Sequence, residues 1–116
     1  METITKKAIK GGEFLTRETH AHEIFIPEEW NEEQKMVAQT CYDFIKQEIW
    51  PRLDEIDTQK DPALMPKLMD KAGELGLLGT SVPTEYGGFG MSFNTTMLVA
   101  GALGGSHSFA VAYGAH

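Results

Sequence analysis

The sequence is poor in residues that several common protein classes require. It holds one cysteine, Cys41, in 116 residues, which excludes an intramolecular disulfide framework and a cysteine-rich zinc site. Ten Lys and Arg are outnumbered by seventeen Asp and Glu, for a net charge of −7, so we expect no nucleic-acid partner. The polar amino terminus has no apolar run followed by a cleavage site, and with the single thiol this predicts a cytoplasmic protein.

Charged side chains are also missing from the last part of the chain. No Asp, Glu, Lys or Arg occurs in residues 86–116, although about a quarter of the residues of an ordinary domain are charged. A membrane span over residues 97–116 would have a suitable length, but Ser106-His107-Ser108 and four glycines within it argue against one. We therefore expect this segment to be covered by other protein.

Hydrophobic periodicity divides the chain into an irregular arm and a helical body. Residues 1–27 have no sustained period, and they end in a short extended stretch at 23–27. A long helix is predicted from its N-cap, Asn31, to Trp50, because Pro51 begins a new turn. The apolar positions of this helix recur every three or four residues and are Met36, Val37, Thr40, Cys41, Phe44, Ile45 and Ile49.

Further helices are predicted, each with its own start or stop signal. They cover residues 51–57, 62–75, 93–103 and 106–116, with candidate N-caps at Asp61, at Ser92 or Asn94, and at Ser106 or Ser108. The glycine-rich turn at 84–90 is expected to rest its aromatic side chains on the body. No β-α-β alternation occurs. The prediction is an all-α fold, an irregular up-down bundle of four to five helices, and the absence of a stop signal in the last helix indicates a truncated domain.

No set of residues forms a recognisable catalytic or metal-binding group. The turn at 86–90 lacks the Lys and Ser/Thr of a phosphate-binding loop, and His20-Ala21-His22 has no third metal ligand nearby. Cys41 lies on an apolar stripe, as a small core residue does, and helix capping accounts for His107. A Ser–His relay needs an acid that the tail does not supply. We therefore expect no catalytic residue, cofactor ligand or metal ligand within this chain.

The succession of motifs, however, resembles a known family. Residues 69–79 read MDKAGELGLLG, residues 82–90 read VPTEYGGFG, and residues 108–116 read SFAVAYGAH. In this order, after a long helix, they are similar to the amino-terminal helical domain of the acyl-CoA dehydrogenases. The resemblance covers about residues 25–116. These flavoenzymes desaturate the α,β bond of fatty acyl thioesters.

The resemblance implies an arm at residues 1–27, which at Gly11–Leu15 looks like longer-chain bacterial members, and a helical domain at 28–116. In the family, a middle β-domain and a carboxy-terminal helical domain cover this region, hold FAD and supply the catalytic glutamate. Acyl-CoA, an electron acceptor and a homo-oligomer are then the expected partners, and the chain alone is expected to be inactive and to bind no FAD. The residues that would line the acyl-tail channel are Phe109, Ala110, Tyr113 and Gly114.

One position departs from the family, and three other interpretations remain open. Gly101 stands where relatives usually place a glutamate, and glycine within a helix costs about 1 kcal/mol relative to alanine. An acyl-CoA oxidase or a flavin monooxygenase of the same architecture would have a similar amino-terminal domain. The third alternative is a helical interaction module that docks through residues 86–116.

Overall fold

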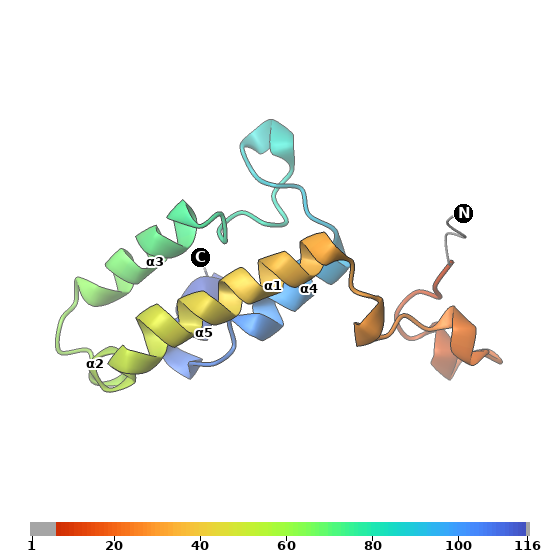
Figure 1. The fold of residues 1–116 in the computed structure, drawn as a ribbon, viewed down its shortest axis with the longest axis horizontal. Helices are drawn as coiled ribbons and strands as arrows, with labels where there is room; N and C mark the ends of the chain where they lie inside the picture. Colours follow the sequence, from red (N-terminus) through yellow and green to blue (C-terminus); the bar gives the residue numbers. More distant parts are fainter. Residues whose placement is uncertain (1–6, 116) are drawn as a thin grey trace. The chain divides into compact units, whose positions relative to one another are not determined.

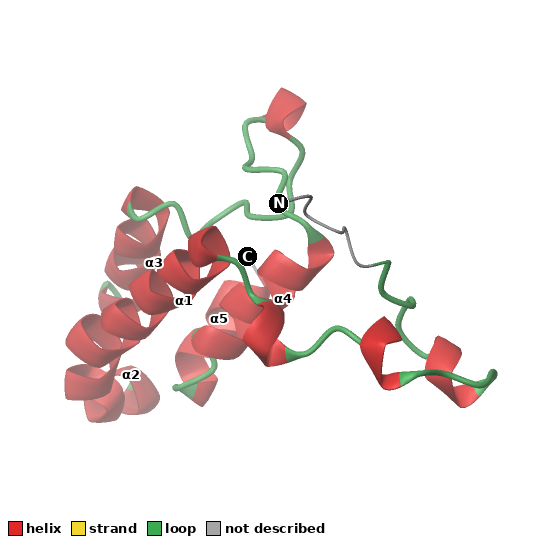
Figure 2. Cartoon of the chain, turned by 45° about the vertical axis from the view of Figure 1, so that its right-hand side comes forward, coloured by secondary structure: helices red, strands yellow, loops and turns green. Residues whose placement is uncertain are grey.

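Helices are the only regular elements in residues 7–115, the part of the chain that the computed structural model describes (Figures 1 and 2). The predicted all-α fold class is therefore confirmed. The chain separates into two compact units, and the division falls between Asn31 and Glu32.

The first unit is built from short 3-10 turns. These turns are Glu13–Leu15, Ala21–Glu23 and Pro27–Glu29. The backbone N–H of Ile9 donates to the Glu23 carbonyl at 2.9 Å, and the Arg17 guanidinium pairs with the Glu23 carboxylate at 3.1 Å. Ile24 and Ile26 have extended backbone angles, as predicted, but 3-10 turns on both sides make the extended stretch shorter than residues 23–27.

The second unit opens with the long helix that the periodicity predicts. It consists of α1 (Glu32–Phe44), a π-helical turn (Ile45–Ile49), a 3-10 turn (Trp50–Arg52) and α2 (Leu53–Thr58). Phe44, Ile45 and Ile49 are buried as expected. Met36 is not, because its side chain is 71% exposed. At 100° per residue Met36 lies about 140° around the helix from the buried Cys41, so it belongs to the solvent side.

Three further helices complete the second unit. They are α3 (Leu64–Glu74), α4 (Phe93–Ala102) and α5 (His107–Ala115). The Ser92 hydroxyl accepts the backbone N–H of Thr95 at 3.3 Å, and the Ser106 hydroxyl accepts that of Phe109 at 3.4 Å. Of the candidate caps for α4 and α5, Ser92 and Ser106 are therefore the ones used.

One hydrophobic core joins these helices. α4 lies alongside α1, and α5 contacts both α2 and α3 (Figure 1). The largest fully buried side chains come from α1 and the π-helical turn after it, α3, α4, the residue after α4, and α5; they are Cys41, Ile45, Ile49, Leu68, Val99, Leu103 and Phe109. A core assembled from four different helices fixes the position of α5, the helix that carries the predicted channel residues.

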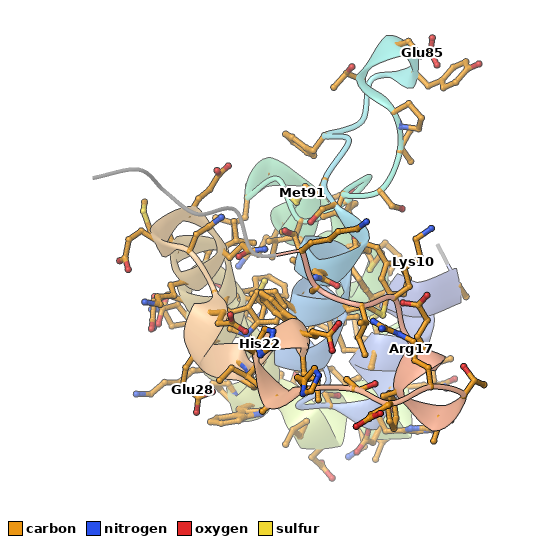
Figure 3. All side chains as sticks on the ribbon, turned by 90° about the vertical axis from the view of Figure 1, so that its right-hand side faces the viewer. Lys10, Arg17, His22, Glu28, Glu85 and Met91 are labelled. Carbon is orange, nitrogen blue, oxygen red and sulfur yellow. The ribbon has the colours of Figure 1, made fainter. Side chains whose placement is uncertain are left out.

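The glycine-rich segment between α3 and α4 forms a loop that projects from the helices (Figure 1). Figure 3 shows Glu85 at the far end of this loop and Met91 where it returns to the helices. A Cβ atom at Gly88 would lie 2.1 Å from the Val82 carbonyl oxygen, so only glycine permits this close approach. The expectation that the aromatic side chains rest on the body is wrong for Tyr86, which is 77% exposed at the loop tip.

Candidate functional site

Helix α5 is held at its amino-terminal end by a contact with α2. The Ser108 hydroxyl donates a hydrogen bond to the Asp57 carboxylate at 2.6 Å, across 51 residues of sequence. A carboxylate is favourable here because the first turn of a helix carries partial positive charge on its free N–H groups. Asp57 therefore compensates in space for the acids that residues 86–116 lack in sequence.

A second contact holds the other end of α5. The Tyr113 hydroxyl donates to the backbone carbonyl of Leu77, just after α3. Burial raises the pKa of Tyr113, and an interaction with the buried Thr80 side chain partly offsets that effect. The phenol therefore stays protonated and remains a donor at neutral pH.

The middle of α5 is anchored by an aromatic side chain in the core. Phe109 is fully buried, with its ring centroid 5.4 Å from that of Phe44 and 6.2 Å from that of Tyr113. These separations lie within the range of attractive aromatic pairs. Together with the two terminal contacts, the aromatic cluster leaves α5 little freedom to shift.

The four residues predicted to line a channel are divided between two sides of α5. Phe109 and Tyr113 face the interior of the domain. Ala110 is partly exposed, and Gly114 is exposed with no atom within 4 Å of an added Cβ. The outward side of α5 therefore presents small residues, whereas the inward side presents the aromatic anchors.

Apolar side chains are exposed on both α4 and α5. Phe93 is 75% exposed, Met97 48% and Val111 57%. Lys, Arg, Asp and Glu are all absent from residues 86–116, so no charged side chain of this segment solvates these positions. Within α4, the buried hydroxyl of Thr96 has no hydrogen-bond partner. The segment that was expected to be covered by other protein is only partly covered by this chain.

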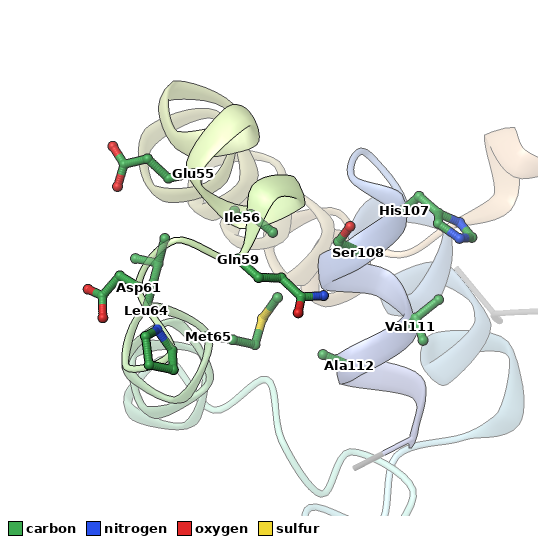
Figure 4. A pocket seen from close by; sticks show the side chains of 11 residues that line it. Glu55, Ile56, Gln59, Asp61, Leu64, Met65, His107, Ser108, Val111 and Ala112 are labelled. Carbon is green, nitrogen blue, oxygen red and sulfur yellow. The ribbon is translucent and has the colours of Figure 1, made fainter.

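Two pockets adjoin these helices, and sequence reasoning located neither. One, of about 560 Å³, lies between α2, α3 and α5, with Gln59, Met65 and Ala112 among its lining residues (Figure 4). The other, of about 450 Å³, lies between α1 and α4 beside Gly101, where an added Cβ would meet no atom within 4 Å. Their lining residues come from helices distant in sequence, so only the fold brings them together.

The residues considered for metal or thiol chemistry lie apart from α5. The His20 and His22 rings stack with centroids 5.6 Å apart, and residues 7–115 contain no group of three or more His, Cys, Asp or Glu suited to a metal ion. Burial raises the pKa of the Cys41 thiol to about 11, which confirms that it is a core residue. Among the described helices, none has the length and apolar character needed to cross a membrane.

Comparison with known proteins agrees with the order of the motifs. The family model of the acyl-CoA dehydrogenase N-terminal domain matches residues 31–116. A probable acyl-CoA dehydrogenase of Bacillus subtilis is 39% identical over 107 residues, which cover 92% of this chain and 18% of the relative. Bovine mitochondrial isovaleryl-CoA dehydrogenase is 34% identical over 87 residues, covering 74% of this chain and 20% of the relative.

A solved structure gives the same result in three dimensions. The crystal structure of an acyl-CoA dehydrogenase from Bacillus anthracis, complexed with FAD, matches with a TM-score of 0.84 and 40% sequence identity. The match covers 94% of this chain and 18% of the Bacillus anthracis chain. A helical domain without a catalytic group of its own, similar to one end of a larger flavoenzyme, is thus the class that the fold defines.

The chain belongs to the acyl-CoA dehydrogenase family and corresponds to its N-terminal domain. It spans about a fifth of the length of the relatives that it matches.

Proposed function

We propose that this chain is the N-terminal domain of an FAD-dependent acyl-CoA dehydrogenase and forms one wall of its acyl-tail channel. The domain comprises residues 28–116, preceded by an arm at 1–27. The observation that carries the proposal is the outward side of α5, which is small, apolar and free of charge on a helix fixed at both ends. Binding a fatty acyl tail requires such a surface, because each methylene must leave water for an apolar environment.

The four channel residues have different tasks in this proposal. Ala110 and Gly114 form the wall, because their small side chains leave room for methylene groups. Phe109 and Tyr113 hold that wall in place from the inward side, through the aromatic cluster and the hydrogen bond to Leu77. The channel width would then depend on how firmly α5 is held as well as on the residues that face it.

The proposal assigns the other wall to the middle and carboxy-terminal domains of the longer protein. Exposed apolar side chains on α4 and α5, such as Phe93 and Val111, support this assignment, since large exposed apolar patches usually mark interfaces. Acyl-CoA, an electron acceptor and a second copy of the longer protein complete the set of proposed partners. The free, buried Cys41 suits a reducing compartment, and we place the protein in the cytoplasm.

The residues of this chain do not by themselves fit FAD. The flavin's pyrophosphate calls for cationic side chains or a cluster of free backbone N–H groups. Residues 86–116 contain no Lys or Arg, and the larger pocket has Glu55 and Asp61 among its lining residues. FAD therefore belongs to the other domains in this proposal, and no catalytic step is assigned to a residue of this chain.

The absence of activity can be tested on the chain itself. The purified chain is mixed with FAD, and flavin fluorescence and dye reduction with palmitoyl-CoA are followed. We expect neither flavin binding nor turnover. Stoichiometric flavin binding, or measurable dye reduction, would contradict the division of tasks between the domains.

The channel is tested in the full-length protein that carries this domain. Ala110→Leu should lower kcat/KM for palmitoyl-CoA by roughly 10- to 200-fold, the range for a misfit of about one methylene, and should leave butyryl-CoA within about threefold. Ala8→Leu, the same change at an exposed position of the arm, serves as the matched control. An equal loss with both substrates, or no loss with either, would show that Ala110 does not line the channel.

A further inference from the structure

We propose that the pocket between α2, α3 and α5 binds a small aliphatic primary amine in its ammonium form (Figure 4). This site is separate from the outward side of α5, and the inference does not depend on the proposed role in an acyl channel. Three features of the pocket support it: the apolar lining, the free hydrogen-bond acceptors, and the charge at one end.

The size and apolar lining of the pocket suit an aliphatic chain. Its volume of about 560 Å³ lies within the range of roughly 300–1,000 Å³ that is typical of small-molecule sites. Met65 from α3 and Ala112 from α5 point toward one another across it (Figure 4). Ile56 and Leu64, both buried, continue this apolar surface. Methylene groups placed between α3 and α5 would thus contact carbon on both sides.

Hydrogen-bond acceptors lie beside the apolar surface. Gln59 has φ = 51°, and among residues 7–115 it is the one non-glycine residue with positive φ. Its carboxamide points into the pocket and makes no hydrogen bond with the described residues (Figure 4). The Ser108 hydroxyl gives its proton to Asp57, so its lone pairs remain available. A ligand with several N–H donors fits this arrangement, and an ammonium group has three.

The charge around the pocket selects a cation. Glu55 and Asp61 lie together at one end of the pocket (Figure 4). Neither carboxylate forms an ion pair with the described residues, and Asp61 accepts only the backbone N–H of Ala63. No Lys or Arg lines the pocket; Lys60, in the same turn, is not among the lining residues. A carboxylate or phosphate ligand would be repelled here, whereas an ammonium ion would be attracted.

The proposal is tested by titrating the ¹⁵N-labelled chain with hexylamine and following its amide resonances. We expect saturable shifts at Gln59, Met65 and Ala112. Hexanol, of equal length, should bind about fivefold more weakly, the size expected from losing two exposed ion pairs. Hexanoate and methylamine, which lack the positive charge and the apolar chain respectively, should produce no saturable shifts at these residues.

Variants separate the two parts of the site. Ala112→Phe fills the apolar part and should weaken hexylamine binding at least tenfold, and Gln59→Ala provides a second test that leaves the helix packing intact. The double change Glu55→Gln and Asp61→Asn should bring hexylamine to within about twofold of hexanol. Glu85→Gln, in the projecting loop, removes one charge elsewhere and should leave binding unchanged.

Several outcomes would overturn the proposal. Shifts that do not saturate, or that centre on residues outside the pocket, would exclude a site there. Binding of hexanoate as tightly as hexylamine would exclude the role of the charge. If Ala112→Phe does not fold, unchanged hexylamine affinity in both Gln59→Ala and the double variant would be sufficient to reject the site.

Discussion

Replacing Phe44 by alanine should destabilise the second unit more than almost any other single truncation. Phe44 is 3% exposed, and its ring packs against that of Phe109, with the two centroids 5.4 Å apart. Phe→Ala at a buried site costs about 3–5 kcal/mol, because the lost transfer free energy is increased by the cavity that remains. The aromatic pair itself contributes about 0.5–1.5 kcal/mol of that loss.

The loss is large in relation to the whole domain, since domains of this size are stabilised by roughly 5–15 kcal/mol. It is measured by urea unfolding, followed by far-ultraviolet circular dichroism at low protein concentration. Phe44→Leu, which keeps most of the volume, should lie between the wild type and Phe44→Ala. It also supplies a folded variant if the alanine variant unfolds in buffer.

The matched control is Phe93→Ala, the same change at a position that is 75% exposed. Surface changes usually stay within about 0.5 kcal/mol, so the two alanine variants should differ by several kcal/mol. Equal losses for Phe44→Ala and Phe93→Ala, or a loss below about 1 kcal/mol at Phe44, would show that the core is not arranged as described.

Three other variants and one property of the unmodified chain provide further tests. Gly88→Ala places a Cβ 2.1 Å from the Val82 carbonyl oxygen, so proteolysis within the loop should become faster while the urea midpoint stays unchanged; an unaltered cleavage rate would contradict this. Tyr113→Phe removes the hydrogen bond to Leu77 and should cost about 1–2 kcal/mol in urea unfolding, with no loss if that bond is absent. Cys41, with its pKa raised from 9.0 to about 11, should resist iodoacetamide at pH 8 until urea is added. Because the unfolded thiol ionises first, stability should fall between about pH 9 and 11, and Cys41→Ala should weaken that fall. Lastly, the apolar side chains exposed on α4 and α5 should make the chain self-associate in sedimentation equilibrium, and a monomer at all concentrations would contradict this.

Local patterns were sufficient to predict the helices. The 3.6-residue period placed α1, α3 and α4, and Ser92 and Ser106 cap α4 and α5 through hydrogen bonds that reach only three residues along the chain. Pro51 marked the change of direction after the long helix because proline has no N–H to donate to the preceding turn. Signals of this kind depend on neighbours in sequence and need no knowledge of the tertiary fold.

Predictions failed where burial depends on a distant partner. Met36 looks apolar and periodic in the sequence, yet no described element covers its side of α1, and its side chain is 71% exposed. Tyr86 was expected to rest on the body, but the close approach of Gly88 to Val82 directs the loop away from the helices. The sequence contains the apolar residue in both cases, but it does not say which surface is available to cover it.

The sequence by itself determined the helical class, the capping residues, the charge-free segment at 86–116 and the family, because each follows from composition or from the order of short motifs. Only the tertiary structure decided which side of α5 faces outward. Its two terminal contacts, Ser108 to Asp57 and Tyr113 to Leu77, join residues 51 and 36 positions apart. Such pairs form only after the helices have packed, since the free energy that holds them comes from the shared core and not from either segment alone.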